Sequence, residues 1–593
     1  MTAMTRGAAL GPAYRAGALR ALADTEFDVL VVGGGVTGAG AALDAVSRGL
    51  TVALVEARDW AAGTSSRSSK LIHGGLRYLE QLDFALVREA LAERSLLLTR
   101  LAPHLVRPVP FLVPLEHRGW ERFYIGAGVS LYDVLGGARS MPRHRYLSRR
   151  RAARIAPALR GGARHGAIEY FDAQADDARY TVTLARTAAG YGAVAVTRAA
   201  VTGFLHEGER VTGASVTDLE DGRQIAVRAR RVISAAGVWT DDIHAMAGVR
   251  GDLAVRAAKG VHIVVPRDRI RLDTALILRA GQSVLLVIPW GRRWLIGSTD
   301  TVWDLDKATP SASRADVGYL LDRLNAAISP EVTRDDVVAV YAGLRPLLAG
   351  RPAGPGSSGG TAQLSREHAV SQPVPGLVVV AGGKFTTYRV MARDAVDAAA
   401  AGLPAEVPPS VTERLPLLGA DGYEALWNER GQIARRAGLH PARIEHLLDR
   451  YGSATGELLD LVAADPALGR PIGGADGYLR AEAVYAASAE GALHLEDILA
   501  RRMRIAIEEP DAGAATAAEV AALAAPLLGW DAQAVDQEVR GYLQAAEAER
   551  RASEQADDVS ANAARLRPLA QPQLIVDEGA VMEPSRSLQQ HKQ

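Results

Sequence analysis

The stretch FDVLVVGGGVTGAG, residues 27–40, decides the fold expected for this chain. Its first six residues form a short apolar run rich in valine, which is typical of a buried parallel strand. Small residues from Val36 to about Arg48 then predict a helix, and Thr51–Glu56 predicts a second strand. This compact βαβ unit indicates a doubly wound α/β domain at the start of the ordered chain.

The glycines of this stretch follow the spacing G-x-G-x-x-G at Gly33, Gly35 and Gly38. The spacing alone is a weak signal, because 59 glycines produce it by chance. Here it follows a strand and opens a helix, and Glu56 ends the next strand at a distance that suits a ribose contact. Gly33 permits the tight turn, Gly35 lets the backbone approach a pyrophosphate, and Gly38 packs helix against strand. The alternative is a glycine-rich structural turn; the context favours a dinucleotide site at a helix N-terminus.

Two later strands also end in glycines. They are RVISAAG, residues 231–237, and VVVAGG, residues 378–383. Three such turns, far apart in the sequence, fit one long cofactor touched by several segments. Since only one fingerprint is present, the pattern favours noncovalently bound FAD and leaves no second site for NAD(P).

Cationic side chains stand in glycine-rich or turn-like contexts at Lys70, Arg77, Arg345, Arg366 and Lys384. Each alone is typical of a solvated surface, but together, beside a flavin pattern, they indicate a small anionic substrate.

His262 lies at the entry of an apolar strand. Alcohol oxidation needs a base for the hydroxyl proton, and histidine suits neutral pH. The alternative for His262 is a hydrogen-bonded core residue.

Composition excludes several classes of function. The 593 residues suggest two to four domains, and 68 basic against 68 acidic residues argue against a nucleic-acid binder. The absence of cysteine excludes disulfides, thiol nucleophiles, iron–sulfur clusters and cysteine-ligated zinc, and no metal site is predicted. Neither a transmembrane helix nor a signal peptide is expected, because the longest apolar runs have strand length.

The pattern along the chain predicts four regions. Residues 1–25 are expected to be a disordered tail, and residues 26–405 to form interleaved FAD-binding and substrate-binding domains. Residues 406–549, rich in Ala, Leu, Glu and Arg, predict a helical domain, and the polar residues 550–593 a flexible tail.

Seven motifs together resemble the respiratory, FAD-dependent glycerol-3-phosphate dehydrogenases. They are GGGVTGAG (33–40), TSSRSSKLIHGGLRYLE (64–80), GVHIVVPR (260–267), IGSTDT (296–301), GLRPLL (343–348), LSREHAV (364–370) and GGKFTTYR (382–389). Residues 478–508 are similar to that family's helical cap domain. The resemblance implies a Rossmann-type FAD-binding domain interleaved with an antiparallel-sheet substrate domain, like that of glutathione reductase and D-amino-acid oxidase, plus an all-helical C-terminal domain.

The resemblance also implies an activity, namely oxidation of sn-glycerol 3-phosphate to dihydroxyacetone phosphate with electrons passing from FAD to membrane quinone. By similarity, His262 is the base for the C2 hydroxyl, and Arg345 and Lys384 share the catalytic site with it. The residues implied to hold the phosphate and the substrate oxygens are Arg77, Tyr78, Arg345, Arg366 and Lys384. The cofactor contacts are expected at Gly33, Gly35, Gly38, Glu56, Thr64, Ser65, Ser69, Leu71, Gly237, Gly383 and Thr386.

Other functions stay open at this point. An oxygen-reducing glycerophosphate oxidase, another FAD-dependent oxidase such as one for amino acids, or a non-catalytic FAD scaffold would share the fold. The phosphate-type cations count against an amino-acid substrate, and the intact His262, Arg345 and Lys384 count against a scaffold.

A quinone reductase without a membrane span must lie on the membrane surface. The candidate segments are Trp120–Ile125 and the Arg-rich residues 139–164, although a solvated face is the alternative for the latter. We expect a cytoplasmic protein at the inner face of the cell membrane. The oligomeric state stays open, with a homodimer as one option.

Overall fold

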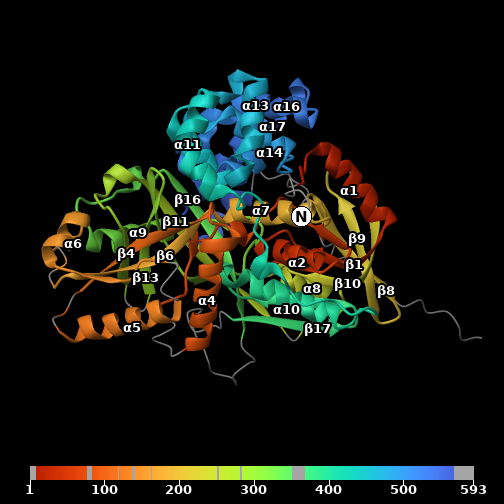
Figure 1. Cartoon of the computed structure of the whole chain (residues 1–593), viewed down its shortest axis with the longest axis horizontal. Helices are drawn as coiled ribbons and strands as arrows, with labels where there is room; N and C mark the ends of the chain where they lie inside the picture. Colours follow the sequence, from red (N-terminus) through yellow and green to blue (C-terminus); the bar gives the residue numbers. More distant parts are fainter. Residues whose placement is uncertain are drawn as a thin grey trace, which may run out of the picture.

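The computed structural model describes residues 8–76, 83–115, 117, 119–136, 141–161, 163, 165–249, 251, 253–280, 283–349 and 367–566. Figure 1 shows one sheet on the right, a second on the left, and the C-terminal helices above both.

The first sheet has the order β17-β18-β10-β1-β2-β7, with β8 and β9 extending it beside β10. The strands are β1 (Glu26–Val32), β2 (Val52–Val55), β7 (Val194–Val196), β8 (Ala199–Glu207), β9 (Arg210–Asp218), β10 (Gln224–Ser234), β17 (His368–Val374) and β18 (Leu377–Gly382). Strands β18, β10, β1, β2 and β7 run parallel to one another. The βαβ start predicted from residues 27–56 is therefore confirmed.

Three helices cover one face of this sheet: α2 (Val36–Ser47), α7 (Asp177–Gly190) and α10 (Tyr388–Ala400). Their alanines pack on the valines and leucines of the strands in one buried cluster. Gly40 allows α2 to approach α10 closely, since a Cβ there would lie 2.8 Å from the Tyr388 ring. The small residue thus lets two of the covering helices pack closely against each other.

The second sheet has the order β15-β11-β14-β13-β12-β4-β6-β3, with β16 on β11 and β5 on β6. Its strands are β3 (Leu71–Ile72), β4 (Val106–Pro114), β5 (Arg145–Leu147), β6 (Ala167–Ala175), β11 (Val255–Pro266), β12 (Ala275–Ala280), β13 (Ser283–Trp290), β14 (Arg293–Gly297), β15 (Thr301–Val302) and β16 (Ala339–Leu348). All pairs are antiparallel except β12 with β4. The chain passes repeatedly between the two sheets, which confirms the interleaved arrangement.

The C-terminal domain packs its helices around buried clusters of its own. Its helices are α11 (Tyr423–Ala437), α12 (Pro441–Tyr451), α13 (Thr455–Ala464), α14 (Arg480–Ser488), α15 (Ile505–Glu508), α16 (Ala517–Leu528), α17 (Ala532–Ser553) and α18 (Asp558–Leu566). The expectation of an all-helical domain holds apart from a two-stranded hairpin, β19 (Pro471–Ile472) with β20 (Ala475–Leu479). The domain boundary near residue 405 stays a prediction.

The N-terminal segment differs from the disordered tail predicted for residues 1–25. Pro12–Asp24 form helix α1, which begins with proline at its first turn. Leu19 and Leu22 are buried against the face of the first sheet that α2 does not cover. The prediction was wrong because a helix with a narrow apolar face has the same Ala- and Arg-rich composition as a disordered tail. The first seven residues lie outside the described part.

The C-terminal segment also differs from the flexible tail predicted for residues 550–593. Helix α17 continues through Ser553, and α18 returns to the second sheet. There Lys259 Nζ of β11, fully buried, donates to Asp316 Oδ2 at 2.6 Å and to Asp558 Oδ1 of α18 at 2.5 Å. A buried ammonium needs such partners, which explains why this polar helix is held. Residues 567–593 lie outside the described part.

Within the described residues, one helical stretch, Pro510–Leu528, is apolar enough to cross a membrane, with a mean hydropathy of 1.2. Its backbone is left-handed from Asp511 to Gly513, so the continuous helix is α16 with 12 residues. At 1.5 Å per residue α16 is about 18 Å long. It falls short of the hydrocarbon core of a bilayer, about 30 Å thick.

Candidate active site

The predicted dinucleotide turn lies where β1 meets α2. Gly33 has φ of 109°, a conformation that favours glycine. A Cβ on Gly38 would lie 1.9 Å from the Gly33 carbonyl oxygen, so a side chain has no space there. Glu56 accepts hydrogen bonds from the backbone N–H of Gly34 at 2.6 Å and of Arg58 at 2.8 Å. The carboxylate is thereby fixed beside the glycine turn.

The 3₁₀ turn η1 (Thr64–Ser66) crosses the N-terminus of α2. Val36 N–H of α2 donates to Ser65 Oγ at 3.0 Å, and Thr64 Oγ1 donates to the Leu344 carbonyl of β16 at 2.6 Å. This turn therefore joins the dinucleotide turn to the second sheet.

The other two glycine turns lie at the same edge of the first sheet. Val32 of β1 is level with Ser234 of β10, which is level with Val379 of β18. Because the carboxyl ends of adjacent parallel strands lie side by side, the turns at Gly33, Gly237 and Gly383 lie close together. This edge is where ligands bind in open α/β sheets. Thr386, after the last turn, accepts from His73 N–H at 3.1 Å through Oγ1.

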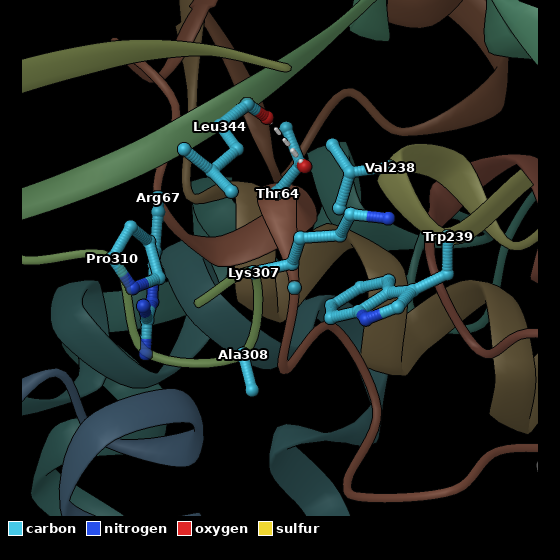
Figure 2. A pocket seen from close by; sticks show the side chains of 9 residues that line it. Thr64, Arg67, Val238, Trp239, Lys307, Ala308, Pro310 and Leu344 are labelled. Atoms are coloured by element: carbon cyan, nitrogen blue, oxygen red, sulfur yellow. Dashed lines mark hydrogen bonds between the residues drawn. The ribbon is translucent and has the colours of Figure 1, made fainter. Parts of the chain in front are cut away.

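A small cavity opens between η1 and the turn after β10. Figure 2 shows Thr64, Trp239 and Lys307 around it. Its enclosed space is on the order of a single water molecule, so it does not by itself outline a ligand site.

The residues at this edge fit FAD. Glycine without a Cβ at 33 and 38, the N-terminus of α2 and the carboxylate of Glu56 are the donor and acceptor set that a pyrophosphate and a ribose need.

His262 is buried on β11, between its neighbouring strands. In register it lies opposite Tyr341 of β16 and Gly297 of β14. The imidazole stacks on the Tyr341 ring with centroids 4.9 Å apart, and a Cβ on Gly297 would lie 2.4 Å from His262 Cδ2. The hydroxyl of Ser69 lies 2.8 Å from His262 Nε2. Burial, then the charges of Arg345 and Lys70, lower the pKa of His262 to about 3, so the free imidazole is neutral at physiological pH.

Arg345 lies on β16, the strand that pairs with β11, which carries His262. Its guanidinium donates to Ser298 Oγ at 2.5 Å and to the Thr299 carbonyl at 3.2 Å, and it pairs with Asp300 at 3.3 Å. Gly260 on β11 makes room for it, since a Cβ there would lie 2.5 Å from Arg345 Nη2. The arginine is partly exposed, so its charge is accessible to a ligand.

The remaining predicted residues divide into two groups. Lys384 directly follows Gly383 at the edge of the first sheet, just before η7 (Phe385–Thr387), and Leu71 begins β3. Arg77, Tyr78 and Arg366 lie outside the described residues, and their roles stay predictions.

Sequence reasoning missed three residues around the site: Tyr341, Asp177 and Arg504. Tyr341 supports the His262 ring, while the other two hold the segment that carries Ser69. The only local signal for Tyr341 is its spacing from Arg345: on one strand, residues an even number of positions apart lie on the same face. Nothing local marks Asp177 or Arg504, because their partners are distant in the sequence.

Comparison with known proteins identifies the family. The family described as "FAD dependent oxidoreductase" matches residues 28–398, and "C-terminal domain of alpha-glycerophosphate oxidase" matches residues 410–535. Glycerol-3-phosphate dehydrogenase 2 of Mycobacterium tuberculosis is 58% identical over 94% of each chain. The bovine mitochondrial glycerol-3-phosphate dehydrogenase is 35% identical, over 87% of this chain and 72% of its own length.

The fold agrees with a solved structure from this group. The glycerol-3-phosphate dehydrogenase of Bacillus halodurans, complexed with FAD, superposes with a TM-score of 0.73 at 26% identity. The match covers 90% of this chain and 97% of that one. The chain is therefore an FAD-dependent oxidoreductase and belongs to the glycerol-3-phosphate dehydrogenase family.

Proposed function

We propose that the protein oxidises sn-glycerol 3-phosphate to dihydroxyacetone phosphate and passes the electrons to a membrane quinone. One observation carries the proposal: His262 is buried and neutral, and it lies beside the edge that fits FAD. Its strand, β11, pairs with β16, the strand of Arg345. FAD, which the glycine turn and Glu56 would hold, would supply the hydride acceptor for C2 of the substrate.

In this proposal His262 takes the proton of the C2 hydroxyl. A neutral imidazole has a lone pair for this proton, and stacking on Tyr341 together with the Ser69 contact fixes the ring. The low pKa of the free His262 makes it a weak base, partly because Arg345 is nearby. The phosphate of the bound substrate offsets cationic charge, so His262 becomes more basic when substrate is present.

Arg345 binds oxygen atoms of the substrate in the same proposal. A guanidinium offers a planar fork that matches phosphate, and part of this one is exposed to a ligand. Its partners include a hydroxyl, a carbonyl and a carboxylate, which orient the fork.

Anaerobic reduction of the flavin tests substrate and acceptor together. We expect sn-glycerol 3-phosphate to bleach the visible flavin band of the purified protein, and a soluble quinone analogue to restore it rapidly, whereas air restores it slowly. A flavin that stays oxidised with this substrate contradicts the proposal. Rapid reoxidation by air with formation of peroxide would instead establish the oxygen-reducing oxidase.

Helix α5 (Trp120–Gly136) supports contact with a membrane surface. One face packs inward through Ile125, Val129 and Tyr132. The other exposes Trp120, Phe123 and Val134, which are 60%, 78% and 77% exposed. Figure 1 shows α5 at the margin of the molecule, on the side away from the C-terminal helices. An exposed apolar face with interfacial aromatics suits the headgroup region of a bilayer.

A basic segment adjoins this helix. Tyr146 of β5 lies under Arg122 of α5, with the guanidinium carbon 4.8 Å from the ring centroid. The chain then continues into α6 (Arg149–Ile155), where Arg149, Arg150 and Arg151 are exposed. Each basic residue near an anionic lipid surface contributes about 1 kcal/mol to binding.

Vesicle co-sedimentation tests this surface. We expect the protein to bind vesicles that contain anionic lipid and to dissociate at high salt, and reversal of charge at Arg149, Arg150 and Arg151 to weaken binding about tenfold or more. Phe123→Glu is expected to weaken binding throughout the range of salt concentration in which the wild-type protein binds. Val559→Glu, at a similarly exposed apolar residue of α18, is the matched control. Unchanged binding of the charge-reversed variant would count against the basic segment.

A further inference from the structure

The segment Ser66–Lys70, here called the serine loop, carries the hydroxyl that contacts His262. Ser69 Oγ lies 2.8 Å from His262 Nε2. The hydroxyl of Tyr341, whose ring stacks on His262, donates to the Ser68 carbonyl at 3.1 Å. The position of the serine loop therefore sets the orientation of the imidazole.

Asp177 of α7 holds the serine loop from one side. Its Oδ2 accepts from Ser68 N–H at 2.9 Å and from Ser68 Oγ at 2.7 Å, and its Oδ1 accepts from Lys70 Nζ at 2.8 Å. Asp177 and Lys70 are both fully buried. A single carboxylate thus fixes the two residues that flank Ser69.

Arg504 of the C-terminal domain reaches the same place from the other side. It is 3% exposed and stands just before α15, with φ of 71°. Its Nη2 donates to the Ser66 carbonyl at 2.9 Å and to Asp177 Oδ1 at 3.3 Å. Lys70 Nζ also donates to the Ser66 carbonyl, at 3.1 Å. Two buried cations therefore converge on one carbonyl and one carboxylate.

The burial of these groups makes the arrangement sensitive to the loss of one member. A charged group in a low-dielectric site must be paired, and removal of one partner leaves the others uncompensated. Without Arg504 the Ser66 carbonyl loses a donor and Asp177 loses a cation. The serine loop is the element that can move in response, because it has no strand or helix ladder of its own beyond η1.

We propose that Arg504 is a positioning residue. From the C-terminal domain it holds the serine loop through Ser66 and Asp177, so that Ser69 keeps the His262 imidazole in its working orientation. The role of His262 in this inference rests on the proposed function. The C-terminal domain then contributes to catalysis through the arrangement of the base, without touching substrate.

The test compares Arg504→Gln, Arg504→Lys, Ser69→Ala and the double variant Arg504→Gln/Ser69→Ala as full-length holoenzymes. We expect Arg504→Gln to slow flavin reduction at saturating sn-glycerol 3-phosphate by about 10- to 100-fold, the size typical of a misplaced catalytic group. The KM for substrate and the bound FAD are expected to stay near wild type. Arg504→Lys recovers most of the rate, because it restores one cationic donor.

The double variant separates positioning from general destabilisation. If Arg504 acts through Ser69, Arg504→Gln/Ser69→Ala is no slower than the slower single variant. Arg186→Gln is the matched control, since Arg186 is a buried arginine of α7 that donates to Tyr485 Oη of the C-terminal domain at 2.7 Å. We expect it to lower the melting temperature and to keep the wild-type rate of flavin reduction.

A second readout needs no substrate and so stands apart from the proposed function. The imidazole ¹⁵N signals of His262 in the oxidised holoenzyme, assigned with His262→Gln, are expected to shift in Arg504→Gln in the same direction as in Ser69→Ala. Wild-type signals in Arg504→Gln, or rate losses that multiply in the double variant, overturn the positioning role. A wild-type flavin that sn-glycerol 3-phosphate fails to reduce overturns the proposed function alone.

Discussion

Replacement of His262 by glutamine is expected to slow flavin reduction by sn-glycerol 3-phosphate by about 10²- to 10⁴-fold, the contribution typical of a positioned general base. Glutamine keeps much of the volume between Tyr341 and Gly297, so the strand packing survives while the proton acceptor is lost. Rapid mixing under anaerobic conditions measures the rate directly. A loss of less than about threefold would show that another group takes the proton.

His104 offers the matched control for this substitution. It is also buried, and burial lowers its pKa to about 3, but it lies against Tyr423 and the loop at Gly419, two residues before β4, which β12, β13 and β14 separate from the His262 strand. His104→Gln is expected to keep the wild-type rate of flavin reduction, so a common effect of both variants would indicate unfolding.

The pKa of His262 fixes how the rate depends on pH. A histidine whose pKa is lowered to about 3 is already deprotonated at pH 5, so His262 itself puts no acid limb near 6.5 on kcat/KM, which reports the ionisations of the free enzyme and the free substrate. The fall that His262 causes comes as the pH approaches 3 and the imidazole becomes protonated, whereas a fall at about pH 6 belongs to the second ionisation of the substrate phosphate. In the substrate complex the phosphate raises this pKa, so the acid limb of kcat lies at higher pH than that of kcat/KM.

Substitution of Gly38 by alanine is expected to abolish FAD binding. The new Cβ would lie 1.9 Å from the Gly33 carbonyl oxygen, far inside van der Waals contact, and both atoms belong to the backbone turn or to α2. The N-terminus of α2 must then move away from β1, and with it the amides that face the pyrophosphate. The flavin absorbance per protein after gel filtration measures the loss.

Gly318 of α9 (Arg314–Ala327) provides the control for Gly38→Ala. It is also a helical glycine, but a Cβ there meets no atom within 4 Å. Gly318→Ala is expected to retain FAD fully and to stabilise the fold by about 0.5–1 kcal/mol, because alanine is the better helix former. Full retention of FAD by Gly38→Ala would refute the assignment of this turn.

The fold could be predicted where local sequence carries it. Residues 27–56 contain a complete βαβ unit, and its strand, turn and helix are each marked by neighbours in the chain. Helix α1 was missed because its apolar face is narrow: only Ala18, Leu19 and Leu22 are buried, so its composition resembles that of a tail. Helix α18 was missed because its reason to be ordered, Lys259, lies 299 residues away.

The candidate site, like the fold, could be predicted only where local sequence marks its residues. The three glycine turns could be placed together because parallel strands align their ends. Local context singled out His262 and Arg345, and the resemblance gave them roles. The contact of Arg504 with Asp177 spans 327 residues and depends on how the C-terminal domain packs on α7. In the sequence, Arg504 belongs to a run of arginines that is equally typical of an exposed helix end.

The ion pair between Lys259 and Asp558 has a consequence for synthesis on the ribosome. Lys259 of β11, three residues before His262, leaves the ribosome long before its second carboxylate, which follows 299 residues later. At about 5–20 residues per second this interval is about 15–60 s. During this interval β11 has been synthesised, but of the two carboxylates that pair with Lys259 only Asp316 is present. The buried lysine of the active-site strand therefore lacks its second carboxylate until α18 has been synthesised.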